Sequence, residues 1–412
     1  MRLIYDLGLV IYRMSIRIAS IFNDKARLWL KGRENLFANI LKQVNPQEKI
    51  AWFHCASLGE FEQGRPVIEA FRKQNPECKI LLTFFSPSGY EIRKNYNGAD
   101  YIFYLPMDSK RNAEKFIEFI NPSVVVFIKY EFWYHYIQTL NNKNIPVYLI
   151  SANFRSTQIF FKRYGGFFRN LLKFFTYIFV QTSSSKDLLS TIGLNNISVA
   201  GDTRFDRVYS IVKQANRLPV VEKFKQNKTT IIVGSSWKED EEILIPCLNQ
   251  TFHDVKWIIA PHEIHEENLS RIIRNINKRI VRYSEMSREN ASDFDVLLID
   301  NIGMLSSLYY YGDIAYIGGG FGKGIHNILE AATFGIPVIF GPNFKKFHEA
   351  VELINQEGAF SIRSFEELMN TLDTLLQNQE LLDTAGKIAK KFIENSLGAT
   401  NIIVEKLVTK KS

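Results

Sequence analysis

The sequence contains few cysteines and no long apolar segment near its start, and each shortage excludes a class of protein. Its 412 residues include three widely spaced cysteines, Cys55, Cys78 and Cys247, which form no C-x-x-C pair. This pattern argues against a disulfide-stapled fold and a zinc knuckle, and it fits a reducing compartment. The longest uncharged run before residue 18 is Leu7–Tyr12, whereas a membrane-spanning helix needs ~20 apolar residues.

Several ligand motifs and targeting signals are also missing. The seven histidines show no H-x-x-x-H or H-E-x-x-H spacing, so we expect neither a metal site nor a cofactor. No G-K-[ST] follows the glycine-rich segment near residue 320, which excludes a P-loop, and that segment also fails the G-x-G-x-x-G spacing. A signal peptide fits poorly, because Arg13 and Arg17 would interrupt its apolar region.

The composition that is present is typical of a globular protein with two domains. Hydrophobic residues make up 46% and charged residues 23%, which excludes disordered and fibrous classes. The length suggests two domains that each bury a sizeable core. The net charge of +8 is uneven. Residues 1–33 hold two acids, Asp6 and Asp24, and seven basic residues, Arg2, Arg13, Arg17, Lys25, Arg27, Lys31 and Arg33.

The N-terminal segment has the pattern of an amphipathic helix. On a helical wheel of residues 3–22, nine apolar side chains fall within roughly 120° of arc. They are Leu3, Ile4, Leu7, Val10, Ile11, Met14, Ile18, Ile21 and Phe22. Arg2, Asp6, Arg13 and Arg17 flank this arc, which favours a helix lying on an anionic membrane surface. The alternative is an N-terminal helix packed on its own domain. The positive charge gathers here without an aromatic-lined basic groove, so we expect no nucleic-acid partner.

After residue 48 short apolar runs alternate with helical stretches, and the rhythm restarts after residue 228. This βαβα pattern predicts an α/β fold with two doubly wound, Rossmann-like domains and a ligand site at the strand ends, in the cleft between them. The predicted strands are Ile50–Cys55, Lys79–Phe84, Tyr101–Leu105, Val124–Ile128, Val147–Ile150, Tyr177–Val180, Thr229–Val233, Trp257–Ala260, Val296–Ile299, Ile314–Ile317 and Val338–Phe340. We expect a linker in 202–228 and only helices in 364–410. The predicted parts are an amphipathic segment 1–33, a domain 34–210 and a domain 211–412.

Two carboxylates follow strands of the first predicted domain. Glu60 lies in the turn Ser57-Leu58-Gly59-Glu60 after the first strand, where it either complements a helix dipole or acts as a general base beside Gly59. Glu131 follows the strand Val124–Ile128 at the same edge of the sheet. Two acids from different strand ends of one sheet suggest a site more strongly than either acid alone.

The second predicted domain contains a glycine-rich loop between a strand and a predicted helix, an arrangement suited to anions. The loop and the expected first helical turn contain Gly318, Gly319, Gly320, Gly322, Lys323, Gly324, His326, Asn327 and Glu330. Ser235 and Ser236 follow another strand and either hold a phosphate or cap a helix. Pro261 and His262 occupy a comparable place after the strand Trp257–Ala260.

Together these segments resemble the bacterial 3-deoxy-D-manno-octulosonic acid (Kdo) transferases, lipid A glycosyltransferases of GT-B architecture. The similarity runs almost from end to end of the chain. It covers the amphipathic start and the stretches Trp52–Arg65, Ser151–Tyr164, Gly201–Asp206, Gly234–Leu244 and Asp300–Pro342.

The resemblance implies transfer of Kdo from CMP-Kdo to a lipid A precursor (lipid IVA) by a peripheral or monotopic protein at the cytoplasmic face of the inner membrane. The family's catalytic base maps onto Glu60, and a second functional glutamate of an E-T-E-L-W-P element maps onto Glu131. The glycine loop, its amides, the serine pair and Pro261-His262 map onto the donor site. Ser57, Gly59 and Arg155 map onto contacts with the acceptor or the donor carboxylate.

The chain departs from the family at two of these positions. Lys129 stands where the family has the first acid of its E-T-E element, and Tyr134 replaces the proline. Pro261 stands where the family has an arginine, so Lys323 or Lys238 would have to supply that phosphate contact. Two alternatives remain open: a GT-B enzyme that uses a UDP-sugar, such as a lipid-linked acetylglucosamine transferase or an epimerase, and a non-catalytic lipid A-binding protein.

Overall fold

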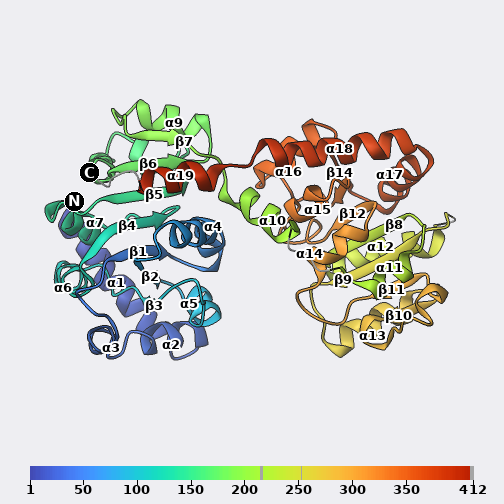
Figure 1. The fold of residues 1–412 in the computed structure, drawn as a ribbon, viewed down its shortest axis with the longest axis horizontal. Helices are drawn as coiled ribbons and strands as arrows, with labels where there is room; N and C mark the ends of the chain where they lie inside the picture. The colour runs from blue at the N-terminus through green and yellow to red at the C-terminus, as the bar shows by residue number, and fades with distance from the viewer. Residues whose placement is uncertain (214–216, 252, 409–412) are drawn as a thin grey trace. The chain divides into compact units, whose positions relative to one another are not determined.

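The computed structural model describes residues 1–213, 217–251 and 253–408, which form two compact units (Figure 1). Unit 1 comprises Met1–Arg207 and Leu397–Ser412, and unit 2 comprises Val208–Ser396. Each unit contains one seven-stranded sheet whose recorded strand pairs are all parallel. The α/β class predicted from the alternating runs is therefore confirmed.

In unit 1 the strand order is β3-β2-β1-β4-β5-β6-β7. Its elements are α1 (Arg2–Ala19), α2 (Asp24–Lys31), α3 (Leu36–Gln43), β1 (Ile50–Cys55), α4 (Leu58–Gln74), β2 (Lys79–Phe84), α5 (Pro87–Arg93), β3 (Tyr101–Tyr104), α6 (Lys110–Ile120), β4 (Pro122–Ile128), α7 (Tyr134–Asn142), β5 (Val147–Ala152), α8 (Gly166–Leu172), β6 (Tyr177–Val180), α9 (Ser183–Ser190), β7 (Ile197–Val199), α10 (Thr203–Lys213), which continues past the boundary between the units, and α19 (Ala399–Val408).

Both faces of this sheet are buried, as the continuous apolar runs require. On β1, Trp52 packs into a core that includes apolar residues of α3, α6 and α7. Its neighbours Ala51 and Phe53 point to the opposite face, into a core that includes residues of α4 and α19. All six residues of β1 are buried, so the strand is held rigidly and the turn that follows it starts from a fixed point.

In unit 2 the strand order is β10-β11-β9-β8-β12-β13-β14. Its elements are α11 (Pro219–Lys225), β8 (Thr230–Ser236), α12 (Lys238–Gln250), β9 (Lys256–Pro261), α13 (Glu266–Asn275), β10 (Ile280–Arg282), β11 (Val296–Leu298), α14 (Leu305–Leu308), β12 (Ile314–Ile317), α15 (Leu329–Thr333), β13 (Val338–Phe340), α16 (His348–Asn355), β14 (Ala359–Ser361), α17 (Phe365–Gln377) and α18 (Gln379–Asn395).

The strand orders define one topological switch point in each sheet. In unit 1 the chain builds outward from β1 through β2 to β3 and then returns to the other side of β1 with β4. In unit 2 it builds outward from β8 through β9 and then returns to the other side of β8 with β12. Ligands of open α/β sheets bind outside the carboxyl ends of the strands at such points. The switch points are therefore β1/β4 and β8/β12.

The eleven predicted strands all exist, and the sequence patterns missed three others. These are β7, β10 and β14, which are three residues long. Each lies at an edge of its sheet, and none is fully buried along its length. A short edge strand is paired on one side only, so it lacks the continuous apolar run that marks a central strand.

The structure corrects the expected domain division at the C-terminus. Residues 211–412 were expected to form one domain, but the chain returns after residue 396, and α19 belongs to unit 1. Ile403, Val404 and Leu407 of α19 are buried in the same core as residues of α4, and Figure 1 shows this helix in red beside the strands of unit 1. The apolar pattern predicted the helix but not its partner. Residues 409–412 lie outside the described ranges.

The predicted linker 202–228 is mostly helical where the structure describes it. It contains α10 and α11, with residues 214–216 outside the described ranges. The boundary between the units falls after Arg207, within this segment. Its charged, weakly patterned sequence is explained by short, partly exposed helices rather than by irregular chain.

Candidate functional site

Glu60 lies at the β1/β4 switch point of unit 1. The chain leaves the buried strand β1 and, after Ala56 and Ser57, enters α4, so Glu60 falls in the first helical turn. The Ser57 hydroxyl donates a hydrogen bond to the Glu60 carboxylate. About a fifth of the Glu60 side chain (19%) remains exposed. Glu60 is thus anchored at one oxygen and still open to solvent, as a group that exchanges protons with a substrate must be.

Gly59 leaves open space beside this carboxylate. A Cβ at Gly59 would meet only the Ser57 hydroxyl, at 3.8 Å. The glycine is exposed and is not needed for packing within the chain. This agrees with a surface that a substrate approaches closely.

Lys129 is the residue of this site that the sequence patterns did not single out as functional. It directly follows β4, and its Nζ lies 4.0 Å from Oε1 of Glu60. Its backbone is left-handed, with φ of 74°, a conformation that non-glycine residues adopt rarely and that often occurs at functional sites. Its replacement of the family's acid was visible in the sequence, but its proximity to Glu60 depends on the neighbouring positions of β1 and β4.

Glu131 is buried, in contrast to Glu60. Its carboxylate lies 3.1 Å from Nε2 of His54 and accepts a hydrogen bond of 2.6 Å from the Trp133 indole. Nδ1 of His54 lies 2.8 Å from the Thr83 hydroxyl, which also accepts from the Trp52 indole. These five side chains form one polar network inside the sheet edge. Only 7% of Glu131 is exposed, so its contacts are those of an anchor for the segment after β4.

Arg155, another predicted contact, lies near the same edge of the sheet. It follows β5, is exposed, and its positive charge acts on the pKa of Tyr130, which burial raises. The Tyr130 hydroxyl in turn donates to the Asn153 carbonyl, at 2.7 Å. The segments after β1, β4 and β5 therefore supply Glu60, Lys129 and Arg155 at neighbouring strand ends.

Close backbone packing shapes the glycine loop at the β8/β12 switch point of unit 2. A Cβ at Gly318 would lie 2.2 Å from the Ser235 carbonyl oxygen, and a Cβ at Gly320 would lie 2.5 Å from the Gly341 nitrogen. Gly319 has a positive φ of 89°. By contrast, a Cβ at Gly322 would meet its nearest atom at 3.8 Å. Side chains at positions 318–320 would clash with the neighbouring backbone or strain their own, so this part of the loop requires glycine.

Five amides of the predicted phosphate-binding loop already donate hydrogen bonds within the protein. Gly319 N–H donates to the buried Asp240 carboxylate at 2.7 Å, and His326 N–H donates to the Gly318 carbonyl at 3.0 Å. The N–H groups of Gly318, Gly322 and Gly324 also donate to backbone carbonyls. These glycines shape the loop rather than present free donors.

Asp240 holds the glycine loop to α12, a contact that no motif indicated. Its carboxylate accepts from the N–H groups of Gly319 and Trp237 and from the Tyr316 hydroxyl. Burial raises its pKa, and these three hydrogen bonds oppose that shift. Asp240 lies among three acids in the first turn of α12, and only the fold shows which of them contacts the glycine loop.

Three rings form a stack beside the loop. The Trp237 and His262 ring centroids lie 4.1 Å apart, and those of His262 and His326 lie 4.8 Å apart. The Trp237 indole donates to Nε2 of His326 at 2.9 Å, which leaves Nδ1 to carry the proton of the neutral ring. Burial, and secondarily His262, lowers the pKa of His326. The stack offers a planar surface and an N–H donor.

Two expectations for the donor residues are corrected here. The Ser236 side chain is buried, and its hydroxyl donates to Glu241 at 2.9 Å, so it is not available to a phosphate. His326 and Asn327 do not lie on a helical turn, because α15 begins at Leu329. The loop stays irregular up to the helix since its backbone groups pair with β8 and with one another rather than with a helical turn.

The remaining predicted donor residues lie around the loop. Asn327 donates to Glu330 at 3.0 Å, and Glu330 also accepts from the Ser306 hydroxyl. Lys323 is exposed at the tip of the loop, Ser235 has a left-handed backbone with φ of 54°, and Pro261 ends β9 next to His262. Ser235 and Ser236 were expected to follow a strand but are the last residues of β8, and Pro261 is the last residue of β9. Unit 2 thus gathers the predicted residues at or just after the carboxyl ends of β8, β9 and β12.

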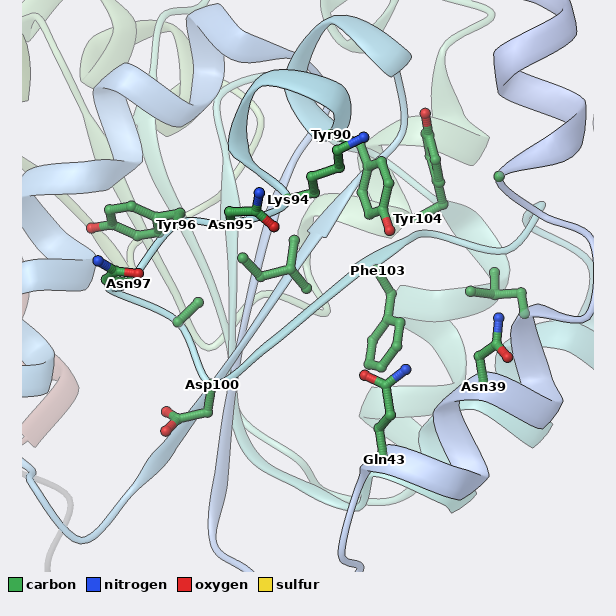
Figure 2. A pocket seen from close by; sticks show the side chains of 14 residues that line it. Asn39, Gln43, Tyr90, Lys94, Asn95, Tyr96, Asn97, Asp100, Phe103 and Tyr104 are labelled. Atoms are coloured by element: carbon green, nitrogen blue, oxygen red, sulfur yellow. The ribbon is translucent and has the colours of Figure 1, made fainter.

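A cavity of about 660 Å³ lies elsewhere in unit 1, beside the edge strand β3 (Figure 2). Asn39 and Gln43 of α3 line one side, and Tyr90 and Lys94 line another. None of the predicted site residues lines it, so we assign it no part in the chemistry.

Neither a metal cluster nor a membrane span is found in the described residues. No group of three or more His, Cys, Asp and Glu side chains among them is arranged to hold a metal ion. In the ranges 1–213, 217–251 and 253–408, no helix combines the length and apolar character needed to cross a membrane.

Comparison with known proteins shows that the sequence is similar to one family. Residues 31–207 match the family described as 3-deoxy-D-manno-octulosonic-acid transferase (kdotransferase). The 3-deoxy-D-manno-octulosonic acid transferase of Aquifex aeolicus is 29% identical over 349 residues, covering 82% of this chain and 90% of the relative. That of Rickettsia bellii is 29% identical over 360 residues, covering 84% of each.

Solved structures with the same fold are more distant in sequence. The UDP-GlcNAc 2-epimerase of Neisseria meningitidis has a TM-score of 0.59 and 19% identity, covering 88% of this chain and all of that one. MurG of Acinetobacter baumannii has a TM-score of 0.56 and 14% identity, covering 88% and 99%. These likenesses support the GT-B fold expected from the sequence.

Proposed function

We propose, from the premise that this chain belongs to the 3-deoxy-D-manno-octulosonic acid (Kdo) transferase family of glycosyltransferases, that it moves Kdo from CMP-Kdo to a lipid A precursor such as lipid IVA. The observation that carries the proposal is the placement of Glu60. It lies at a switch point, in a first helical turn, anchored by Ser57 and partly exposed. A buried carboxylate such as Glu131 lacks that access.

Glu60 acts as the general base of the transfer. It takes the proton from a hydroxyl of the acceptor sugar as that oxygen attacks the anomeric carbon of Kdo. The bond from this carbon to the phosphate oxygen breaks, cytidine monophosphate leaves from the opposite face, and the configuration inverts. Lys129, 4.0 Å from Glu60, places a positive charge where anionic substrates approach. We assign Glu131 and His54 a positioning role, since both are buried in the network behind this edge.

Unit 2 holds the nucleotide through the rings and the loop around its switch point. The ring stack of Trp237, His262 and His326 offers a flat surface and a donor, and Lys323 supplies a charge for the phosphate. The rigid glycine loop keeps these groups in place without reorganisation, so that they stabilise the charge that develops on the leaving phosphate. Asn327 and Glu330 are placed to bind sugar hydroxyls.

We place the protein at the cytoplasmic face of the inner membrane, held there by α1. Apolar side chains of α1 and of the turn that follows it stay exposed in the folded chain, for example Leu3 at 83% and Phe22 at 86%. Arginines flank this face and suit anionic headgroups. A lipid acceptor remains in its bilayer, so an enzyme that binds the surface avoids extracting acyl chains into water.

The test compares Glu60→Gln with Glu69→Gln, a control on the same helix whose carboxylate contacts Arg65. With CMP-Kdo and lipid IVA, loss of the base should lower kcat by about 10²–10⁴-fold. Calorimetric affinity for CMP and the Tm should stay at wild-type values, and CMP should bind more tightly than UDP. Near-normal turnover of Glu60→Gln and Glu60→Ala would refute the base, and a preference for UDP would favour a UDP-sugar enzyme.

A further inference from the structure

Helix α1 has an exposed apolar face and an opposite face that contacts the rest of unit 1. The apolar face is exposed, with Leu7 at 59% and Ile18 at 64%. The opposite face carries Tyr5, Asp6 and Tyr12, which contact the rest of unit 1. The helix is therefore packed on its own domain through a mixed face of Tyr5, Asp6 and Tyr12 with the partly buried Leu9 and Ile16, while its wider apolar face points away. This is the reverse of a helix that buries its apolar stripe in a core.

Two hydrogen-bonded pairs join α1 to α7 and the loop before α6. The Tyr5 hydroxyl donates to Asp108 at 2.5 Å and accepts from the backbone N–H of Tyr134 at 3.3 Å. The Asp6 carboxylate lies 2.6 Å from Nε2 of His135. We call Tyr5, Asp6, Asp108 and His135 the α1 latch.

The receiving side of the latch is itself rigid. Asp108 is 1% exposed and also accepts from the backbone N–H groups of His135 and Tyr136. It thus satisfies the first free amides of α7. Burial raises the pKa of the Tyr5 hydroxyl, so this group stays protonated and donates throughout the physiological range. A buried, fully used acceptor of this kind selects one orientation of its donor.

The latch is continuous with the segment that holds Glu131. Helix α7 begins at Tyr134, three residues after Glu131. Further along α1, the Tyr12 ring stacks on Phe85 with centroids 6.1 Å apart, and Phe85 lies 4.7 Å from the Trp133 ring. The Trp133 indole donates to Glu131. Both ends of the docked face thus contact the elements that position the strand ends of unit 1.

We propose that the α1 latch fixes the orientation of unit 1 on the bilayer, so that Tyr5 and Asp6 are positioning residues for transfer to a membrane-embedded acceptor. The inference rests on the proposed function and adds the device that links membrane binding to the site. A tethered but undocked α1 would still bind lipid through its apolar face. Unit 1 would then rotate relative to the bilayer surface, and the acceptor hydroxyl would reach Glu60 in only a few of its orientations.

The experiment uses the full chain and three variants. Tyr5→Phe/Asp6→Asn removes the latch and leaves the apolar face intact. Gly8→Ala is the control, because a Cβ there meets nothing within 4 Å. Leu7→Ser/Ile11→Ser weakens the apolar face. Each is assayed for co-sedimentation with phosphatidylcholine–phosphatidylglycerol vesicles, for Kdo transfer to lipid IVA in those vesicles, and for transfer in detergent micelles.

The latch variant should sediment with vesicles and transfer Kdo in micelles like the control, yet lose at least about tenfold in rate on vesicles. Trypsin should also cut it faster at the exposed Arg13 and Arg17. Equal vesicle rates or equal cleavage for the latch variant and Gly8→Ala would overturn the latch. If the apolar-face variant sediments as well as wild type, the membrane placement fails instead. If no protein transfers Kdo in micelles, the proposed function itself fails.

Discussion

Unit 1 and unit 2 present different kinds of group at the same topological position. At the β1/β4 point of unit 1, a short turn leads from a buried strand into the long helix α4, and the exposed group is the Glu60 side chain. At the β8/β12 point of unit 2, β12 is followed by an irregular loop of glycines held by Asp240. One sheet end presents a single partly exposed carboxylate, and the other presents a rigid glycine loop beside a ring stack.

Under the proposed function, the difference agrees with what the two parts of a glycosyl transfer require. Accepting a proton needs one side chain with a free lone pair and access to the substrate. Holding a nucleotide phosphate needs donors and charges fixed in advance around a wide ligand. A tight turn suits the first, whereas the second needs a longer loop in which backbones approach closely, which explains why glycines at 318–320 are packed and Gly59 is not.

The largest expected effect on nucleotide affinity comes from disrupting the glycine loop of unit 2. Gly320→Ala places a Cβ 2.5 Å from the Gly341 nitrogen, so the loop has to move. Overpacking costs about 1–3 kcal/mol, which corresponds to about 5- to 150-fold in affinity if the loop must be restored for binding. Calorimetric titration with CMP measures the loss. Gly322→Ala and Gly59→Ala are the controls, and equal CMP affinity for Gly320→Ala would contradict the packing argument.

A second, intermediate effect is on stability and distinguishes Glu131 from Glu60. Glu131→Gln replaces the charged carboxylate contacted by His54 and Trp133 with a neutral amide that has one acceptor oxygen instead of two, so we expect unfolding to become easier by about 1–3 kcal/mol. Glu60→Gln should leave stability nearly unchanged, because its partner Ser57 is close to solvent. Urea unfolding of both variants checks this. If Glu60→Gln is the more destabilised of the two, the assignment of anchor and base has to be exchanged.

The smallest expected effect concerns the ring stack and pH. His326 has a pKa below its ordinary value of 6.5 in the folded chain, mainly through burial. As pH falls through 6.5 the unfolded chain takes up the proton first, so stability decreases until the folded pKa is reached. The change should be less than about 0.5 kcal/mol, because the ring is partly solvated. The difference between the Tm values at pH 7.5 and pH 5.5 should become smaller in His326→Gln than in the wild type. In the exposed control His348→Gln it should stay as in the wild type.

The sequence predicted well wherever a segment is buried on both faces. Every strand it assigned is present, because a central parallel strand needs a continuous apolar run. The sequence also placed Glu60 at the start of a helix, because the apolar run of β1 ends at Cys55 and small residues separate it from α4. It missed β7, β10 and β14, which are short and lie at edges.

The sequence motifs identified individual site residues, but they did not show which of these residues contact one another. Lys129 was noted as a departure from a family element, and only the adjacency of β1 and β4 brings it to Glu60. Ser236 was expected to bind a phosphate, and its engagement by Glu241 became apparent from the fold. The N-terminal helix was read as either membrane-bound or packed. The structure shows it packed on unit 1 by one face with its apolar face still exposed, and membrane contact remains a prediction.

The amino-acid order by itself determined the class of fold, the positions of the central strands, the amphipathic character of α1 and the motifs that mark the family. Such features depend on local periodicity and composition, which the chain carries along its length. Only the tertiary structure decided the strand order, and with it the switch points, the burial of Glu131 and the return of α19 to unit 1. Those depend on contacts between segments far apart in sequence, whose energies no local pattern records.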